Sequence, residues 1–125
     1  LFDEWMDKYQ YIIDLGKDLP LIDETHRKEE NLVKGCQSRV WLQADRDNSH
    51  VVFKADSDAI ITKGIIALLI RVLSHQKPED IAGAELYFID RIGLREHLSM
   101  TRSNGLLSMI KQMKAYSLAY LTKND

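Results

Sequence analysis

Apolar positions in the first part of the chain recur at the spacing of one face of an α-helix. They are Phe2, Trp5, Met6, Tyr9, Ile12 and Ile13. Gly16 follows them, and glycine commonly ends a helix in the left-handed conformation. The pattern therefore predicts a helix over about Phe2–Leu15. The next segment, Lys17–Glu30, contains Pro20 and few apolar residues, so we expect a surface connection there.

Alternation of apolar and polar positions then predicts two β-strands. The alternating apolar residues are Val40, Leu42 and Ala44 in the first strand and Val51 and Phe53 in the second. Asp45–Ser49 between them is rich in turn-forming residues, as in an antiparallel hairpin. A short run at Asn31–Lys34 is the candidate for a further strand. The expected sheet is therefore small and antiparallel, with about three strands.

The segment after the hairpin has the pattern of a central, buried helix. The run Asp56-Ser57-Asp58 offers capping oxygens and negative charge to a helix over about Ala59–His75. This segment is apolar on more than one face, which is typical of a helix surrounded by the core. Gly64 within it indicates close packing against a neighbouring element.

Shorter helical patterns follow, and a longer one ends the chain. Pro78 suits the first turn of a short helix through Ala82. The run Leu86–Ile92 is ambiguous between strand and helix, and we favour a helix. Ser99 is the candidate N-cap of the last helix. The apolar face of that helix consists of Leu106, Met109, Ile110, Met113 and Tyr120.

Length, composition and charge narrow the fold class and the partners. The 125 residues, 45% of them hydrophobic, suffice for one core, so we expect a single α+β domain over residues 1–125. The net charge of −2 and the pI near 6.1 provide no basic excess for phosphates or anionic lipid. The longest apolar stretch, Ile65–Ile70, is too short to cross a bilayer. We therefore expect neither nucleic acid nor a membrane as a partner.

The one cysteine, Cys36, is the residue of chemical interest. It follows Gly35 on a predicted loop, where a thiol is able to move toward a partner. A reactive thiol needs cationic neighbours, a helix N-terminus or backbone amides that favour the thiolate, and Lys34 and Arg39 are near in sequence. A lone cysteine also occurs as a small buried hydrophobe, so both readings stay open. It has no disulfide partner within the chain, which fits a reducing compartment such as the bacterial cytoplasm.

Other catalytic patterns have no support in the sequence. The four histidines, His26, His50, His75 and His97, lie far apart and show no metal-ligand spacing. The six glycines are scattered and form neither a Walker loop nor a dinucleotide fingerprint. We therefore expect no metal and no cofactor bound by this chain.

Three blocks of the chain carry distinctive short motifs. Glu30–Trp41 carries Gly-Cys-x-Ser-x-Val-Trp, Ala55–Ala67 carries Ser-Asp-Ala, and Leu98–Leu106 carries Arg-Ser-Asn-Gly-Leu. Together these blocks resemble the SufE family of sulfur-acceptor proteins. They occur in the family's order, and the first helix with its exit at Leu19-Pro20 also fits. Departures are minor, with Lys34 and Met100 at positions where proline is frequent. The combination is far more specific than a Gly-Cys pair alone.

The resemblance implies a fold, a function and a set of site residues. The family fold is α+β and is shared with iron–sulfur scaffolds of the IscU type. A pyridoxal-phosphate cysteine desulfurase of the SufS type forms a persulfide, Cys36 accepts its outer sulfur, and a scaffold of the SufBCD type receives it. The chain would then be a covalent carrier and desulfurase activator rather than an enzyme alone, with the pyridoxal phosphate held by its partner. The supporting residues implied are Gly35, Ser38, Arg39, Trp41, Asp56, Ser57, Asp58 and Arg102.

Alternatives to the sulfur relay remain at this point. Cys36 could serve a thiol redox sensor that forms a sulfenic acid or an intermolecular disulfide. The chain could also be a binding module in which the cysteine is inert. The run Asp56-Ser57-Asp58 is either a helix cap or a recognition and loop-restraining element, and Arg102 is either a site cation or a surface charge. A persulfide on Cys36 needs protection, for which Val40 and Trp41 are the candidate apolar cover.

Overall fold

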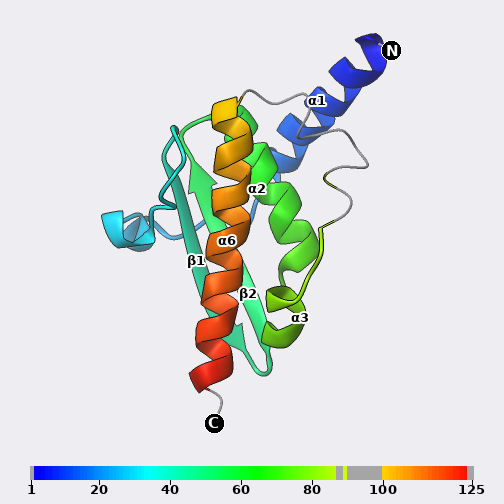
Figure 1. The fold of residues 1–125 in the computed structure, drawn as a ribbon. Coiled ribbons are helices and arrows are strands. Elements are labelled where there is room, and N and C mark those ends of the chain that lie inside the picture. Colours follow the sequence, from blue (N-terminus) through cyan, green and yellow to red (C-terminus); the bar gives the residue numbers. More distant parts are fainter. Residues whose placement is uncertain (1, 87–88, 90–99, 124–125) are drawn as a thin grey trace.

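The computed structural model describes residues 2–86, 89 and 100–123, and it has an α+β fold in which helices pack on a two-stranded antiparallel sheet (Figure 1). The elements are α1 (Phe2–Lys17), β1 (Val40–Asp47), β2 (His50–Ser57), α2 (Ile60–Leu73), α3 (Pro78–Ala82) and α6 (Met100–Lys123). Two 3₁₀ turns, η1 (Glu24–His26) and η2 (Glu29–Asn31), precede β1. The expected helix over Leu86–Ile92 lies, apart from residues 86 and 89, outside the described residues, as does Ser99.

The hairpin of β1 and β2 confirms the predicted alternation. The strands pair from Val40 opposite Ser57 to Asp47 opposite His50. The turn is shorter than predicted, because Asn48 adopts the left-handed conformation with φ 57° and lets the strands continue to Asp47. The residues with no exposed surface lie on one face of the hairpin and form the core side: Val40, Leu42, Val51, Phe53 and Ala55.

The prediction of a third strand is wrong within the described part of the chain. The run Asn31–Lys34 makes only an isolated bridge, between Leu32 and Trp41, because 3₁₀ turn η2 occupies the preceding residues. The predicted surface connection also has more structure than expected. Ile22 donates its N–H to the carbonyl oxygen of Ala55, and both Leu19 and Ile22 are buried. This connection therefore covers the outer edge of β2.

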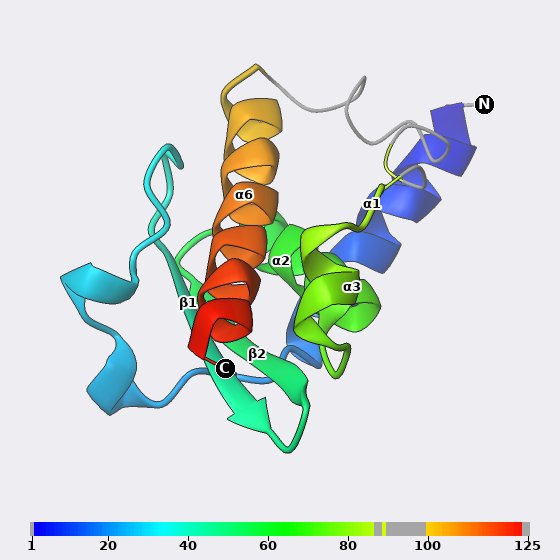
Figure 2. The ribbon, with the colours of Figure 1, turned by 60° about the horizontal axis from the view of Figure 1, so that its bottom comes forward.

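The helices cover the core face of the hairpin. Both views place α6 along β1 and α2 beside it, with α1 on the side of α2 away from α6 (Figures 1 and 2). The predicted face of α6 is confirmed, since Leu106, Met109 and Met113 are buried. The short helix at Pro78–Ala82 is confirmed as α3. Among the described residues, no helix is both long and apolar enough to span a membrane.

Close packing of α1 on α2 depends on two glycines. A Cβ built on Gly64 would overlap the carbonyl oxygen of Ile12, so the predicted close approach at Gly64 is confirmed. A Cβ on Gly16 would lie 3.0 Å from the backbone nitrogen of Gly64. The prediction that Gly16 ends the first helix is wrong, because α1 continues to Lys17 and Gly16 instead lets the two helices approach.

Candidate functional site

Cys36 belongs to a short loop whose two ends are fastened together at the edge of the sheet. Val33 donates its N–H to the carbonyl oxygen of Val40 at 2.8 Å, and Leu32 bridges Trp41. We call the residues between them, Lys34–Arg39, the Cys36 loop. Because its base is hydrogen-bonded, movement of the thiol requires rearrangement of only these few residues.

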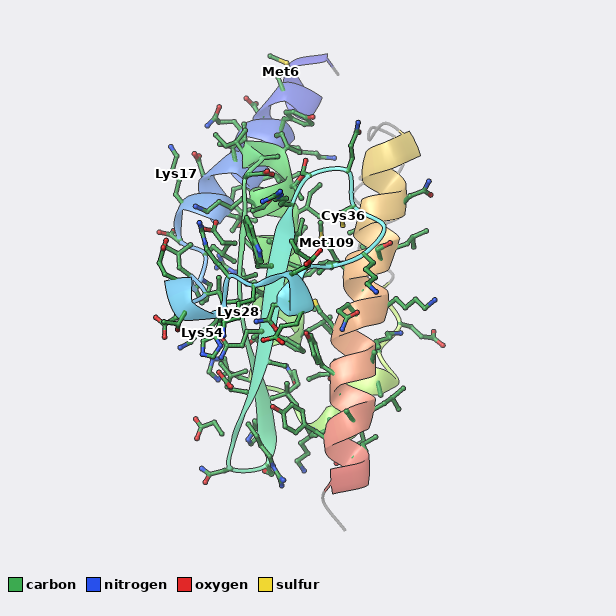
Figure 3. All side chains as sticks on the ribbon, turned by 90° about the vertical axis from the view of Figure 1, so that its left-hand side faces the viewer. Met6, Lys17, Lys28, Cys36, Lys54 and Met109 are labelled. Atoms are coloured by element: carbon green, nitrogen blue, oxygen red, sulfur yellow. The ribbon has the colours of Figure 1, made fainter. Side chains whose placement is uncertain are left out.

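The tip of the Cys36 loop lies against the beginning of α6 (Figure 3). The Sγ atom of Cys36 donates to the carbonyl oxygen of Gly105 at 3.6 Å, which is a weak hydrogen bond. A Cβ built on Gly105 would stand 3.5 Å from Sγ, so the absent side chain leaves room beside the sulfur. The third motif block thus meets the first at this point, although they are far apart in sequence. We call this arrangement the closed position of the loop.

Cys36 is half-buried in the closed position, which lies between the exposed loop thiol and the buried hydrophobe considered from the sequence. Burial raises the pKa of its thiol above the ordinary value, because the buried thiolate would lose hydration. Lys34 and Arg39, the expected activating cations, are exposed. The pKa direction is therefore opposite to that of an activated thiol, and the closed position holds Cys36 as the neutral thiol.

Gly35 allows the loop to pack on α6. Its φ of 91° lies in the region that only glycine adopts readily. A Cβ at this position would also collide with the Oγ atom of Ser108, which follows Gly105 in α6. Glycine is thus required here twice, for its backbone conformation and for its lack of a side chain.

Residues at the end of β2 hold the other end of the Cys36 loop. Asp58 accepts the N–H of Arg39 on its Oδ1 at 3.0 Å, and Ser57 donates its hydroxyl to the carbonyl oxygen of Arg39 at 2.8 Å. The N-cap residue of α2 is Ala59, without a side-chain capping bond. Capping by Asp58, one of the two roles left open from the sequence, is therefore wrong, because its carboxylate binds the loop. The hydrogen bond from Arg39 to Asp58 instead restrains the end of the Cys36 loop.

Asp56 and Trp41 are cross-strand partners on the hairpin face opposite the core. The carboxylate of Asp56 is 6% exposed and pairs with the guanidinium of Arg27, and its Oδ1 lies 3.4 Å from Nζ of Lys63. The guanidinium carbon of Arg27 stands 5.0 Å from the centroid of the Trp41 ring. Asp56 is thus too buried to be a recognition surface. Trp41 lies beneath Arg27, whereas Cys36 contacts Gly105 and packs against the hydrophobic core.

The remaining predicted residues have these positions. Ser38 is half-buried within the Cys36 loop. Arg102 is in the first turn of α6, a turn before Gly105, and its side chain lies outside the described residues. Sequence reasoning missed Arg27, Gly105 as a direct neighbour of the sulfur, and Ser108. A glycine within the third motif block was the available signal for Gly105, whereas Arg27 lies in a segment that carried none.

The fold and the site define a class of protein: an α+β domain that presents one half-buried cysteine on a hydrogen-bonded loop. The sequence profile of the SufE family, described as an Fe-S metabolism associated domain, matches residues 1–117. The chain belongs to the SufE family, as the motif blocks predicted.

Relatives agree with this membership. An uncharacterized SufE-like protein of Rhizobium meliloti (strain 1021) is 42% identical, with 90% of this chain and 84% of the relative aligned. SufE-like protein 1, chloroplastic/mitochondrial, of Arabidopsis thaliana is 39% identical over 94% of this chain but only 32% of its own length. The solution structure of a hypothetical protein from Thermus thermophilus has the same fold, with a TM-score of 0.77 at 22% identity, over 91% of this chain and 84% of that one.

Proposed function

We propose that this chain is a sulfur relay in Fe–S metabolism. Cys36 accepts sulfur from a pyridoxal-phosphate cysteine desulfurase of the SufS type, stimulates that enzyme, and passes the sulfur to an iron–sulfur scaffold of the SufBCD type. Family membership supports the metabolic role. The observation that carries the proposal is the position of Cys36 at the tip of a loop with a hydrogen-bonded base, where the thiol itself makes a weak hydrogen bond to α6. Such a loop is able to extend without unfolding the domain.

The chemistry of transfer needs only the partner's persulfide. The Cys36 thiolate attacks the outer sulfur of that persulfide, a new S–S bond forms on Cys36, and the old S–S bond breaks. The partner's cysteine leaves as a thiolate, and the Cys36 proton passes to solvent or a base in the partner. No external oxidant or reductant is consumed. The pyridoxal phosphate acts only in the partner, where it releases sulfur from cysteine.

The closed position makes the unloaded thiol less reactive. Burial raises the pKa of Cys36, so little thiolate is present while the loop lies on α6. Extension of the loop removes that burial and restores an ordinary thiol pKa. Reaction is thereby tied to loop opening at the partner, which also protects Cys36 from oxidants in a reducing cytoplasm. A redox sensor requires the reverse, an accessible thiol of low pKa.

The direct test is sulfur loading followed by intact mass. The protein is mixed with a candidate desulfurase and free cysteine, and we expect a gain of one sulfur atom that a reductant removes. Cys36→Ser is the matched control, since it keeps the shape of the side chain and the fold. A gain of sulfur by the serine variant, or no gain by the wild type with any desulfurase, would refute the relay. Peroxide consumption without a desulfurase would favour the redox sensor.

Arg102 enters the proposal through its place in the first turn of α6. Its backbone lies within one turn of Gly105, the residue that contacts the sulfur. A guanidinium there would attract a persulfide anion or an acidic group of the partner. We expect Arg102→Ala to slow transfer and Arg102→Lys to restore it in part. Equal transfer rates for wild type and both variants would show that Arg102 has no role in sulfur transfer.

A further inference from the structure

A charge cluster around the buried carboxylate of Asp56 lies on the hairpin face opposite the core, apart from the sulfur itself. We call Arg27, Asp56, Lys63 and Trp41 the Arg27 cluster. Asp56 supplies one carboxylate to two cations and accepts the N–H of Ser57 at 2.8 Å. Arg27 also covers the Trp41 ring. Figure 3 shows η1, the 3₁₀ turn directly before Arg27, on one side of the hairpin and α6 on the other.

The cluster connects directly to the base of the Cys36 loop. Trp41 is the residue that Leu32 bridges, and Val40 beside it receives the N–H of Val33. Arg27 therefore helps to hold the segment before the Cys36 loop against β1, the strand that follows the loop. After Val33 the chain passes from the Arg27 face to the α6 face, where Cys36 meets Gly105.

We propose that Arg27 is a positioning residue for Cys36. It acts through Asp56 and Trp41 by fixing the point from which the Cys36 loop departs. This inference rests on the proposed function, because it states how the relay cysteine is presented to a partner. The role requires no contact between Arg27 and the reacting sulfur.

Two physical arguments support this role over that of an incidental surface ion pair. Exposed ion pairs contribute little because water and salt screen them, but the Asp56 carboxylate is 6% exposed. The guanidinium also lies over an aromatic face, an interaction that favours arginine over lysine. Arg27 is the member of the cluster that comes from the segment before the loop, so its side-chain contacts add to the backbone bonds of Leu32 and Val33 that join this segment to the hairpin.

Loss of Arg27 would lengthen the part of the chain that is free to move. The loop would then extend back from Val33 into η2, and a longer flexible segment places its tip at a fixed point less often. Cys36 would spend less time against Gly105 and would be less ordered when a partner binds. Once bound, the same thiolate would perform the same exchange.

The test compares Arg27→Met and Arg27→Lys with Arg46→Met, a control that removes an exposed arginine near the hairpin turn. For Arg27→Met we expect severalfold faster alkylation of Cys36 by iodoacetamide at neutral pH. We also expect a severalfold higher KM for the chain as the desulfurase's sulfur acceptor, with kcat unchanged. Arg27→Lys keeps the charge but not the planar group, so its alkylation rate and KM should lie between those of wild type and Arg27→Met. Arg46→Met should match wild type in both.

Equal alkylation rates or equal KM values for wild type and Arg27→Met would overturn the inference, as would the same changes in Arg46→Met. Circular dichroism shows whether each variant folds. If Arg27→Met does not fold, Arg27→Lys carries the test and must alkylate faster than wild type. Alkylation requires no desulfurase, so a failure of the relay function, seen as no sulfur loading of the wild type, is distinguishable from a failure of Arg27 positioning.

Discussion

Replacement of Gly35 by alanine should open the Cys36 loop. Gly35 has φ 91°, and holding a residue with a Cβ in left-handed backbone costs about 1–2 kcal/mol. The new Cβ would also collide with Oγ of Ser108. Both costs apply only when the loop lies on α6, because an extended loop is free to choose another φ and leaves Ser108 behind. The substitution therefore destabilises the closed position and not the rest of the fold.

The expected size of the effect follows from that cost. A shift of about 1–2 kcal/mol raises the ratio of open to closed loop by about five- to thirtyfold. If alkylation occurs from the open loop, its rate rises by the same factor until opening no longer limits it. Iodoacetamide labelling of Gly35→Ala and wild type, followed by intact mass at neutral pH, measures this directly. Urea unfolding shows whether global stability has changed.

Ser108→Ala separates the two parts of the Gly35 effect. It removes the Oγ atom from the collision and keeps a good helix former in α6. Ser108→Ala alone should alkylate close to the wild-type rate, and the double variant Gly35→Ala/Ser108→Ala should fall between wild type and Gly35→Ala. A wild-type alkylation rate in Gly35→Ala would refute the closed position as the resting state. Identical rates in the single and double Gly35→Ala variants would exclude the Ser108 collision.

Further predictions concern the scaffold, the loop end and pH. Gly64→Ala should lower the free energy of unfolding by about 3 kcal/mol through overlap with Ile12 and raise it by about 1 kcal/mol through helix propensity. Urea unfolding should therefore show a net loss of about 2 kcal/mol. Unchanged stability would contradict the close helix contact. Asp58→Ala should lose about 1 kcal/mol with its hydrogen bond to Arg39 and speed alkylation of Cys36, whereas a pure helix cap would leave alkylation unchanged. Because burial raises the pKa of Cys36, the thiol's contribution to stability should be present below the ordinary thiol pKa and disappear as pH rises through the folded pKa. The difference in unfolding free energy between wild type and Cys36→Ala should accordingly be smaller at alkaline than at neutral pH, and a difference that grows would contradict the raised pKa.

Short-range pattern determined most of the secondary structure. The alternation at Val40 and Leu42 and the helical spacing of Leu106, Met109 and Met113 both predicted residues that are buried in the structure. Such patterns suffice because each element must turn one apolar face to the core, and its own geometry sets the period. The motif around Gly35 and Cys36 likewise identified the family from the sequence alone.

Only the tertiary structure decided which groups meet. Asp58 could cap α2 or bind the loop, and the nearby N–H of Arg39 decided between them. Glycine is common at helix ends, but Gly16 lies within α1, where its lack of a side chain allows the close approach of α2 at Gly64. These outcomes depend on contacts between segments that are distant along the chain, which local propensity does not encode.

The direction of the Cys36 pKa shows the same division. Neighbours in sequence, Lys34 and Arg39, suggested an activated thiolate, yet both are exposed, while packing against the core and α6 leaves the cysteine half-buried. Gly105, which accepts the thiol's hydrogen bond, comes from the other end of the chain. Sequence alone therefore determined that Cys36 is the sulfur-carrying candidate, and folding determined that its pKa is raised rather than lowered, because desolvation arises only when distant segments pack together.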